Sequence, residues 1–61
     1  MQTTTNNTAK HDAILRAEEL SARNLANGNE YSERGDKMRA EKCYEKATYW
    51  LDKLNSLLGN N

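Results

Sequence analysis

The sequence predicts an all-α fold, a two-helix antiparallel hairpin, on three observations. Apolar residues recur at helical spacing along two long stretches, and Gly35-Asp36 stands between those stretches. The 61 residues include no proline, no alternating apolar and polar run, and Ile14 as their one β-branched aliphatic residue. A chain of this length forms one domain at most, which we expect over residues 9–58.

The first helix is expected over about residues 9–34, after a disordered tail at 1–8 that is rich in Thr and Asn. Thr8 or Asn7 is a plausible N-cap for it. Pairs of opposite charge four residues apart mark a solvent-exposed side. The residues expected on its inner face are Ala13, Ile14, Ala17, Leu20, Ser21, Asn24, Leu25, Gly28 and Tyr31.

The second helix is expected over about residues 36–58, with Asp36 as its N-cap and residues 59–61 as a short tail. Its apolar residues fall within one arc of roughly 140° when residues are placed 100° apart. The residues of this arc are Ala40, Cys43, Tyr44, Ala47, Trp50, Leu51, Leu54, Leu57 and Leu58.

A short link at Gly35 makes the two helices antiparallel neighbours. The numbers of facing residues then sum to about 70 or 71. Small residues of one helix meet larger ones of the other, which supports the hairpin. The expected pairs include Tyr31 with Ala40, Gly28 with Cys43, Asn24 with Ala47, Leu20 with Trp50 and Leu51, Ala17 with Leu54, and Ile14 with Leu57.

The composition of the chain limits the classes of function that it can have. Nine basic and nine acidic residues give no net charge, so a main role in coating nucleic acid is disfavoured. No apolar run approaches the length of a membrane span, and the first residues do not form a secretory signal. One cysteine without such a signal favours a cytoplasmic location. No disulfide within the chain, metal site or cofactor is expected.

Few residues are candidates for chemistry, and no enzyme activity is expected. His11 has no convergent partners in the sequence, so we interpret it as a surface histidine. Cys43 lies within the apolar arc of the second helix and is expected to act as a small hydrophobic residue. No Glu-x-x-His pair, phosphate-binding loop or nucleophile elbow is present.

The stretch from Gly28 to Ala47 resembles a single tetratricopeptide repeat. The matching residues are Gly28, Tyr31, Gly35-Asp36, Ala40, Tyr44 and Ala47. The resemblance implies close helix packing through small residues, aromatic side chains between the helices and a protein-binding role. The bulky residues that the family has on its first helix would fall at Asn24 and Asn27, and its closing proline at Asp52. One repeat does not form a peptide-binding groove.

The small size and the Thr/Asn-rich start also resemble small accessory proteins of enterobacterial phages. This resemblance concerns composition, and no motif carries it.

Two helices leave one side of every apolar row uncovered, and small domains commonly gain stability by association. The arc of the second helix is wider than one neighbour covers, and Leu15, Ala22 and Ala26 add an apolar strip on the first helix. We therefore expect a homodimer that forms a four-helix bundle. The expected dimer interface consists of Leu15, Ala22, Trp50, Leu54 and Leu57.

A basic stripe (Arg39, Lys42, Lys46, Lys53) and an acidic stripe (Glu41, Glu45, Asp52) follow the two edges of the second helix, with Tyr49 between them. Such stripes are either a solvated surface or a docking surface for a charged partner. The docking interpretation predicts an adaptor or regulator that binds another, unidentified protein. The expected partner-binding residues are Lys42, Glu45, Lys46, Tyr49, Asp52 and Lys53.

Two alternatives stay open. The first is a weak nucleic-acid-binding dimer that uses the basic edge of the second helix with Tyr49. The second is a subunit that folds only when it binds its partner, which would show little helicity alone.

Overall fold

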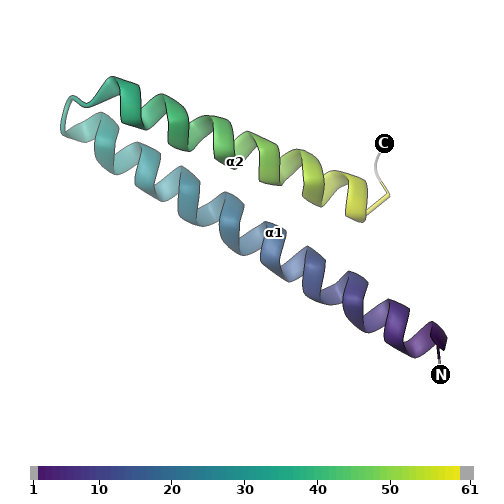
Figure 1. Ribbon diagram of the computed structural model, residues 1–61. Coiled ribbons are helices and arrows are strands. Elements are labelled where there is room, and N and C mark those ends of the chain that lie inside the picture. The colour runs from purple at the N-terminus through teal and green to yellow at the C-terminus, as the bar shows by residue number, and fades with distance from the viewer. Residues whose placement is uncertain (1, 60–61) are drawn as a thin grey trace.

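A computed structural model describes the backbone of residues 2–59 and the side chains of residues 9–59. The chain forms two helices, α1 (Gln2–Glu33) and α2 (Lys37–Leu57). They run antiparallel and side by side from a tight turn, and no strand occurs in the described part (Figure 1). The predicted all-α helical hairpin is confirmed.

Helix α1 begins at Gln2, earlier than the expected start at Ala9, so residues 2–8 have helical backbone where the sequence predicted a disordered tail. Extending a formed helix adds one backbone hydrogen bond per residue, and neither glycine nor proline interrupts this segment. The expected N-cap at Thr8 or Asn7 therefore does not stand at the start of α1. In Figure 1 this first part of α1 runs past the end of α2. Of the two predicted tails, Met1 and residues 60–61 lie outside the described residues.

The turn between the helices is closed by glycine at the end of α1. Gly35 has a φ of 84°, which an L-residue with a side chain rarely adopts. The Gly35 N–H donates to the Ser32 carbonyl at 3.0 Å, and the Asp36 N–H donates to the Tyr31 carbonyl at 2.9 Å. This bond pair is the Schellman motif, which satisfies the last carbonyls of a helix.

Asp36 starts α2, as predicted. Its carboxylate accepts a hydrogen bond from the Arg39 backbone N–H at 3.2 Å. A second carboxylate oxygen lies 3.5 Å from the Arg39 side chain. The cap satisfies a donor that has no partner within the helix, and its negative charge suits the positive end of the helix dipole.

The helices meet through small side chains. Ala17 is fully buried, Ala40 and Ala47 are 3% exposed, and Ser21 is 7% exposed. Larger residues of the predicted inner faces flank these contacts and are half-buried: Ile14, Leu20, Tyr31, Tyr44, Trp50, Leu54 and Leu57. The inner faces were therefore predicted correctly at most positions. Leu25, Leu51 and Leu58 were predicted inside but are 46–50% exposed, because two helices cover only the centre of each apolar arc.

Gly28 lies at a close contact between the two helices, as the sequence predicted. It is buried, and a Cβ atom placed there would lie 2.6 Å from the Tyr44 ring. The Tyr44 hydroxyl donates a hydrogen bond to Asn29 Oδ1 at 2.7 Å. The Tyr44 ring thus packs against the backbone of α1 at Gly28. The sequence predicted Cys43, the residue before Tyr44, as the partner of Gly28.

Candidate interaction surfaces

The hairpin is one helix thick and has two broad faces. Its principal extents are 51 × 19 × 11 Å, and the two helices lie side by side in one layer (Figure 1). Each face therefore exposes one flank of α1 and one flank of α2. Two contacts identify which flanks share a face: Tyr44 lies against Gly28 and Asn29 on one side, and Arg39 lies over Tyr31 on the other.

The first face carries three exposed leucines and fewer charges than the second. Leu51 and Leu58 follow Tyr44 by seven and fourteen residues, so they stand on the Tyr44 flank of α2. Leu25 precedes Gly28 and Asn29 by three and four residues, which places it on the same side of α1. We call this surface the leucine face and define it by Leu25, Leu51 and Leu58. Half-buried Ile14 extends it toward the open end.

The second face gathers most of the positive charge. Lys46 and Lys53 follow Arg39 by seven and fourteen residues on α2. The arginines of α1 recur at whole numbers of helical turns on the same side, next to Tyr31. We call this surface the basic face and define it by Arg16, Arg23, Arg34, Arg39, Lys46 and Lys53.

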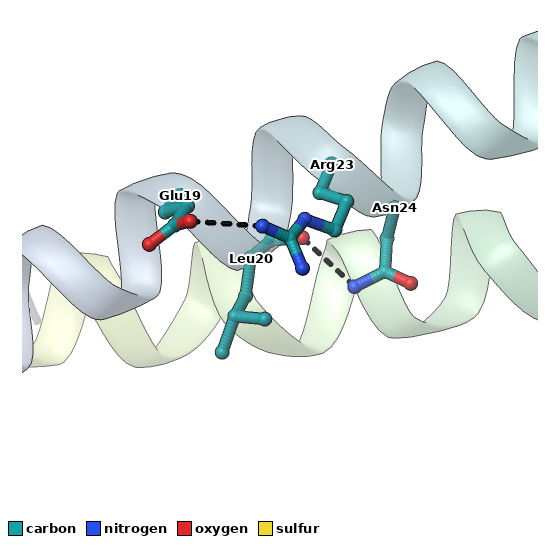
Figure 2. Close-up of polar contacts among 4 residues, drawn as sticks. All are labelled: Glu19, Leu20, Arg23 and Asn24. Carbon is teal, nitrogen blue, oxygen red and sulfur yellow. Dashed lines mark hydrogen bonds and ion pairs between the residues drawn. The ribbon is translucent and has the colours of Figure 1, made fainter.

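Some of these arginines have acidic neighbours within α1. Arg23 pairs with Glu19 at 2.9 Å and Arg34 pairs with Glu30 at 3.0 Å. Figure 2 shows the first pair beside the Asn24 amide, which donates to the Leu20 carbonyl at 2.8 Å. The charged groups of both pairs are more than 60% exposed. Exposed pairs of this kind add little stability, so these arginines are available to another charged molecule.

The predicted partner-binding residues all lie exposed on the outer side of α2. Lys46 and Lys53 lean toward the basic face, whereas Glu45 and Asp52 lean toward the opposite edge. Tyr49 is 56% exposed between the two edges, and its ring meets the Trp50 ring edge-on at 5.1 Å between centroids. The expected arrangement of two charged edges with a central tyrosine is present.

The residues predicted for the dimer interface do not share one face. Trp50, Leu54 and Leu57 are half-buried along the contact with α1. Leu15 is 49% exposed and lies about 200° around α1 from fully buried Ala17, so it points away from α2. Ala22 is exposed one heptad later, on the same outer side.

The leucine face was missed in the sequence because its members were assigned to the inner arcs. The heptad spacing of Tyr44, Leu51 and Leu58 aligns these residues along α2, but it does not show whether they stand at the centre or on a flank of the apolar arc.

The candidates for chemistry stand apart from one another. His11 is exposed, as predicted, and Cys43 is half-buried. Among the described residues, no three His, Cys, Asp or Glu side chains gather as a metal site would require. A shallow, open hollow on α2 is lined by Glu41, Tyr44, Glu45 and Thr48. Neither helix, over its described length, combines the length and hydropathy of a membrane span.

Comparisons with protein-family models, with curated proteins and with solved structures found no match to this chain.

Proposed function

We propose that this protein is a small protein–protein interaction module, an adaptor or regulator that works as a homodimer in the cytoplasm. The observation that carries the proposal is the amount of side-chain surface that the hairpin presents and does not use for its own packing. Among residues 9–59, six large hydrophobic residues are 46–73% exposed. Three of them, Leu25, Leu51 and Leu58, share the leucine face, and exposed apolar patches commonly mark association sites.

The outer side of α2 is the proposed contact for the other protein. It combines an exposed aromatic ring, Tyr49, with positive charge along one edge and negative charge along the other. Tyrosine is enriched where binding energy concentrates, and charge patterns of this type set orientation and specificity. The tetratricopeptide-like packing of Gly28 against Tyr44 supports the same class of function. An origin as a phage accessory protein is compatible with this proposal but has no residue-level support.

Charge reversal tests this surface. The variant Lys46→Glu/Lys53→Glu should reduce capture of the natural partner at least tenfold in an affinity pull-down followed by mass spectrometry. The matched control is Lys10→Glu/Lys37→Glu, which makes the same charge change at exposed positions outside the basic face. Unchanged capture by the first variant, or equal loss in both, would contradict the assignment of this surface.

A second candidate function is weak nucleic-acid binding, and the basic face is the observation that favours it. The hairpin places three arginines of α1 beside three cations of α2. The basic stripe predicted from the sequence contained only the cations of α2. The positive side chains recur at about 10.5 Å along α2, seven residues apart.

A gel shift with a short DNA duplex and a single-stranded RNA separates the two functions. Nucleic-acid binding should appear at low salt and weaken steeply as salt is added, because phosphate contacts release counterions. Absence of any shift at low salt excludes this candidate and leaves the protein-binding proposal in place.

A further inference from the structure

We infer that the leucine face is the homodimer interface, and that a second copy of the chain covers it in antiparallel orientation about a two-fold axis beside Leu51. This inference rests on the proposed homodimer and names its contact surface. It replaces the interface predicted from the sequence, whose residues lie partly on the outer side of α1 and partly in the contact between the helices.

The exposed area supports a second copy as the occupant. The chain exposes 4944 Å². A compact monomer of 7.0 kDa is expected to expose about 4,000 Å². The difference is about 900 Å², and a standard interface buries about 800 Å² on each partner. Part of this excess belongs to the start of α1, which has no second helix beside it. An identical hairpin on one broad face would bury an area of the same order as the excess.

Chemistry distinguishes the leucine face from the other exposed surfaces. Leu25, Leu51 and Leu58 are 47%, 46% and 50% exposed. Their neighbours on this face include Ser21, which is buried, and Tyr44, which is half-buried with its hydroxyl bonded to Asn29. Charges of both signs also stand on this face, since Glu18 precedes Leu25 and Lys37 precedes Tyr44 by seven residues.

The opposite face has six cations, and Arg23, Arg34 and Arg39 among them pair with acidic side chains of the same chain. The other three cations have one sign, so stacking two copies through that face would bring like charges together.

The order of the leucines along the rod favours an antiparallel arrangement. Facing residue numbers sum to about 71, so Leu51 lies level with residue 20 of α1 and Leu58 with residue 13. Leu51 is then between Leu58 and Leu25, with about 10.5 Å of rise toward Leu58 and about 7.5 Å toward Leu25. A two-fold axis across the rod at Leu51 stacks each helix on its own copy, so the two copies of Leu51 meet. Each Leu58 then lies about level with Tyr44 of the second copy, and each Leu25 about level with Ile14 of the second copy.

The resulting four-helix bundle leaves both basic faces and both outer sides of α2 exposed. Dimerisation and partner binding thus use different surfaces of the same hairpin, and substitutions in one need not disturb the other.

Two leucine variants test the interface. Leu51→Lys and Leu15→Lys make the same change at nearly equal exposure, 46% and 49%, the first on the leucine face and the second on the outer side of α1. Sedimentation velocity should show a dimer for the wild-type protein and for Leu15→Lys, and at least tenfold weaker self-association for Leu51→Lys. A dimeric Leu51→Lys variant, or a monomeric Leu15→Lys variant, overturns the inference.

Cross-linking keeps the test valid if Leu51→Lys fails to fold. In a Cys43→Ser background, Leu51→Cys should form a disulfide-linked dimer under air oxidation, because the two copies meet at the axis. Leu15→Cys in the same background should not. Equal cross-linking of both variants contradicts the proposed face. If the wild-type chain is a folded monomer that still captures its partner, the dimer fails while the protein-binding function stands.

Discussion

Gly28 is the residue on which the packing of the two helices depends most directly. In an exposed helix interior, glycine is about 1 kcal/mol less favourable than alanine. At position 28 this preference is outweighed, because an added Cβ would lie 2.6 Å and 2.7 Å from two atoms of the Tyr44 ring. If the ring moved aside, its hydroxyl would lose the hydrogen bond to Asn29.

Gly28→Ala should therefore destabilise the protein by about 1–3 kcal/mol, the usual cost of overpacking a close contact. The neighbouring variant Asn27→Ala is the matched control, because Asn27 is exposed and gains only helix propensity, a few tenths of a kcal/mol. Urea unfolding followed by circular dichroism measures both. An increase in stability for Gly28→Ala would contradict the contact with Tyr44.

Asp36 gives a second prediction at the same scale. Asp36→Ala should lower the free energy of unfolding by about 1 kcal/mol, since the Arg39 N–H loses its acceptor. Asp36→Asn should cost much less, because asparagine keeps a capping oxygen at the same position. Thermal unfolding of the three proteins checks this order. Equal losses in both variants would show that the carboxylate charge, rather than the cap, stabilises α2.

At the scale of the elements, the two helices are unequal in length and in how much of their length is packed. Helix α2 ends at Leu57, which faces the region of Ile14 when partner numbers sum to about 71. The start of α1 extends past this point without a second helix beside it (Figure 1). Helical backbone there depends on local hydrogen bonding alone, which is marginal for Thr and Asn.

Deletion of residues 2–8 should therefore reduce helical ellipticity but lower the midpoint of thermal unfolding by less than about 3 °C, a few tenths of a kcal/mol for a domain of this size. A deletion of equal length, residues 53–59, removes Leu54, Leu57 and Leu58 and should cost more than about 1 kcal/mol. A large loss of stability on deleting residues 2–8 would show that this segment packs against something.

The elements also show what the sequence predicted and what it did not. Three features follow from local chemistry and were predicted correctly: the two α-helices, the turn at Gly35 and the N-cap at Asp36. The inner faces followed from periodicity, because small residues at Ala17, Ala40 and Ala47 allow the helices to approach.

The periodic pattern did not resolve position within an apolar arc. Leu51 lies within the same arc as Trp50 and Leu54, yet only the relative rotation of the two helices decides that it stands at the edge and is exposed. The grouping of the arginines of α1 with the lysines of α2 also depends on that rotation. Neither feature is a property of one helix, so single-helix periodicity could not give it.

At the scale of the whole molecule, a body one helix thick cannot bury large side chains. No large side chain among the described residues is fully buried, and the residues that are buried are small. Hydrophobic stabilisation grows with the apolar area removed from water, so such a hairpin gains little from its own fold. The proposed second hairpin on the leucine face would supply a second layer.

Analytical ultracentrifugation of the wild-type protein between 1 and 100 µM, with thermal unfolding of the same samples, tests this most directly. We predict a particle of twice the 7.0 kDa chain mass at the higher concentrations and a midpoint of unfolding that rises with concentration. A well-folded particle of single-chain mass, with a midpoint that does not depend on concentration, would contradict the dimer.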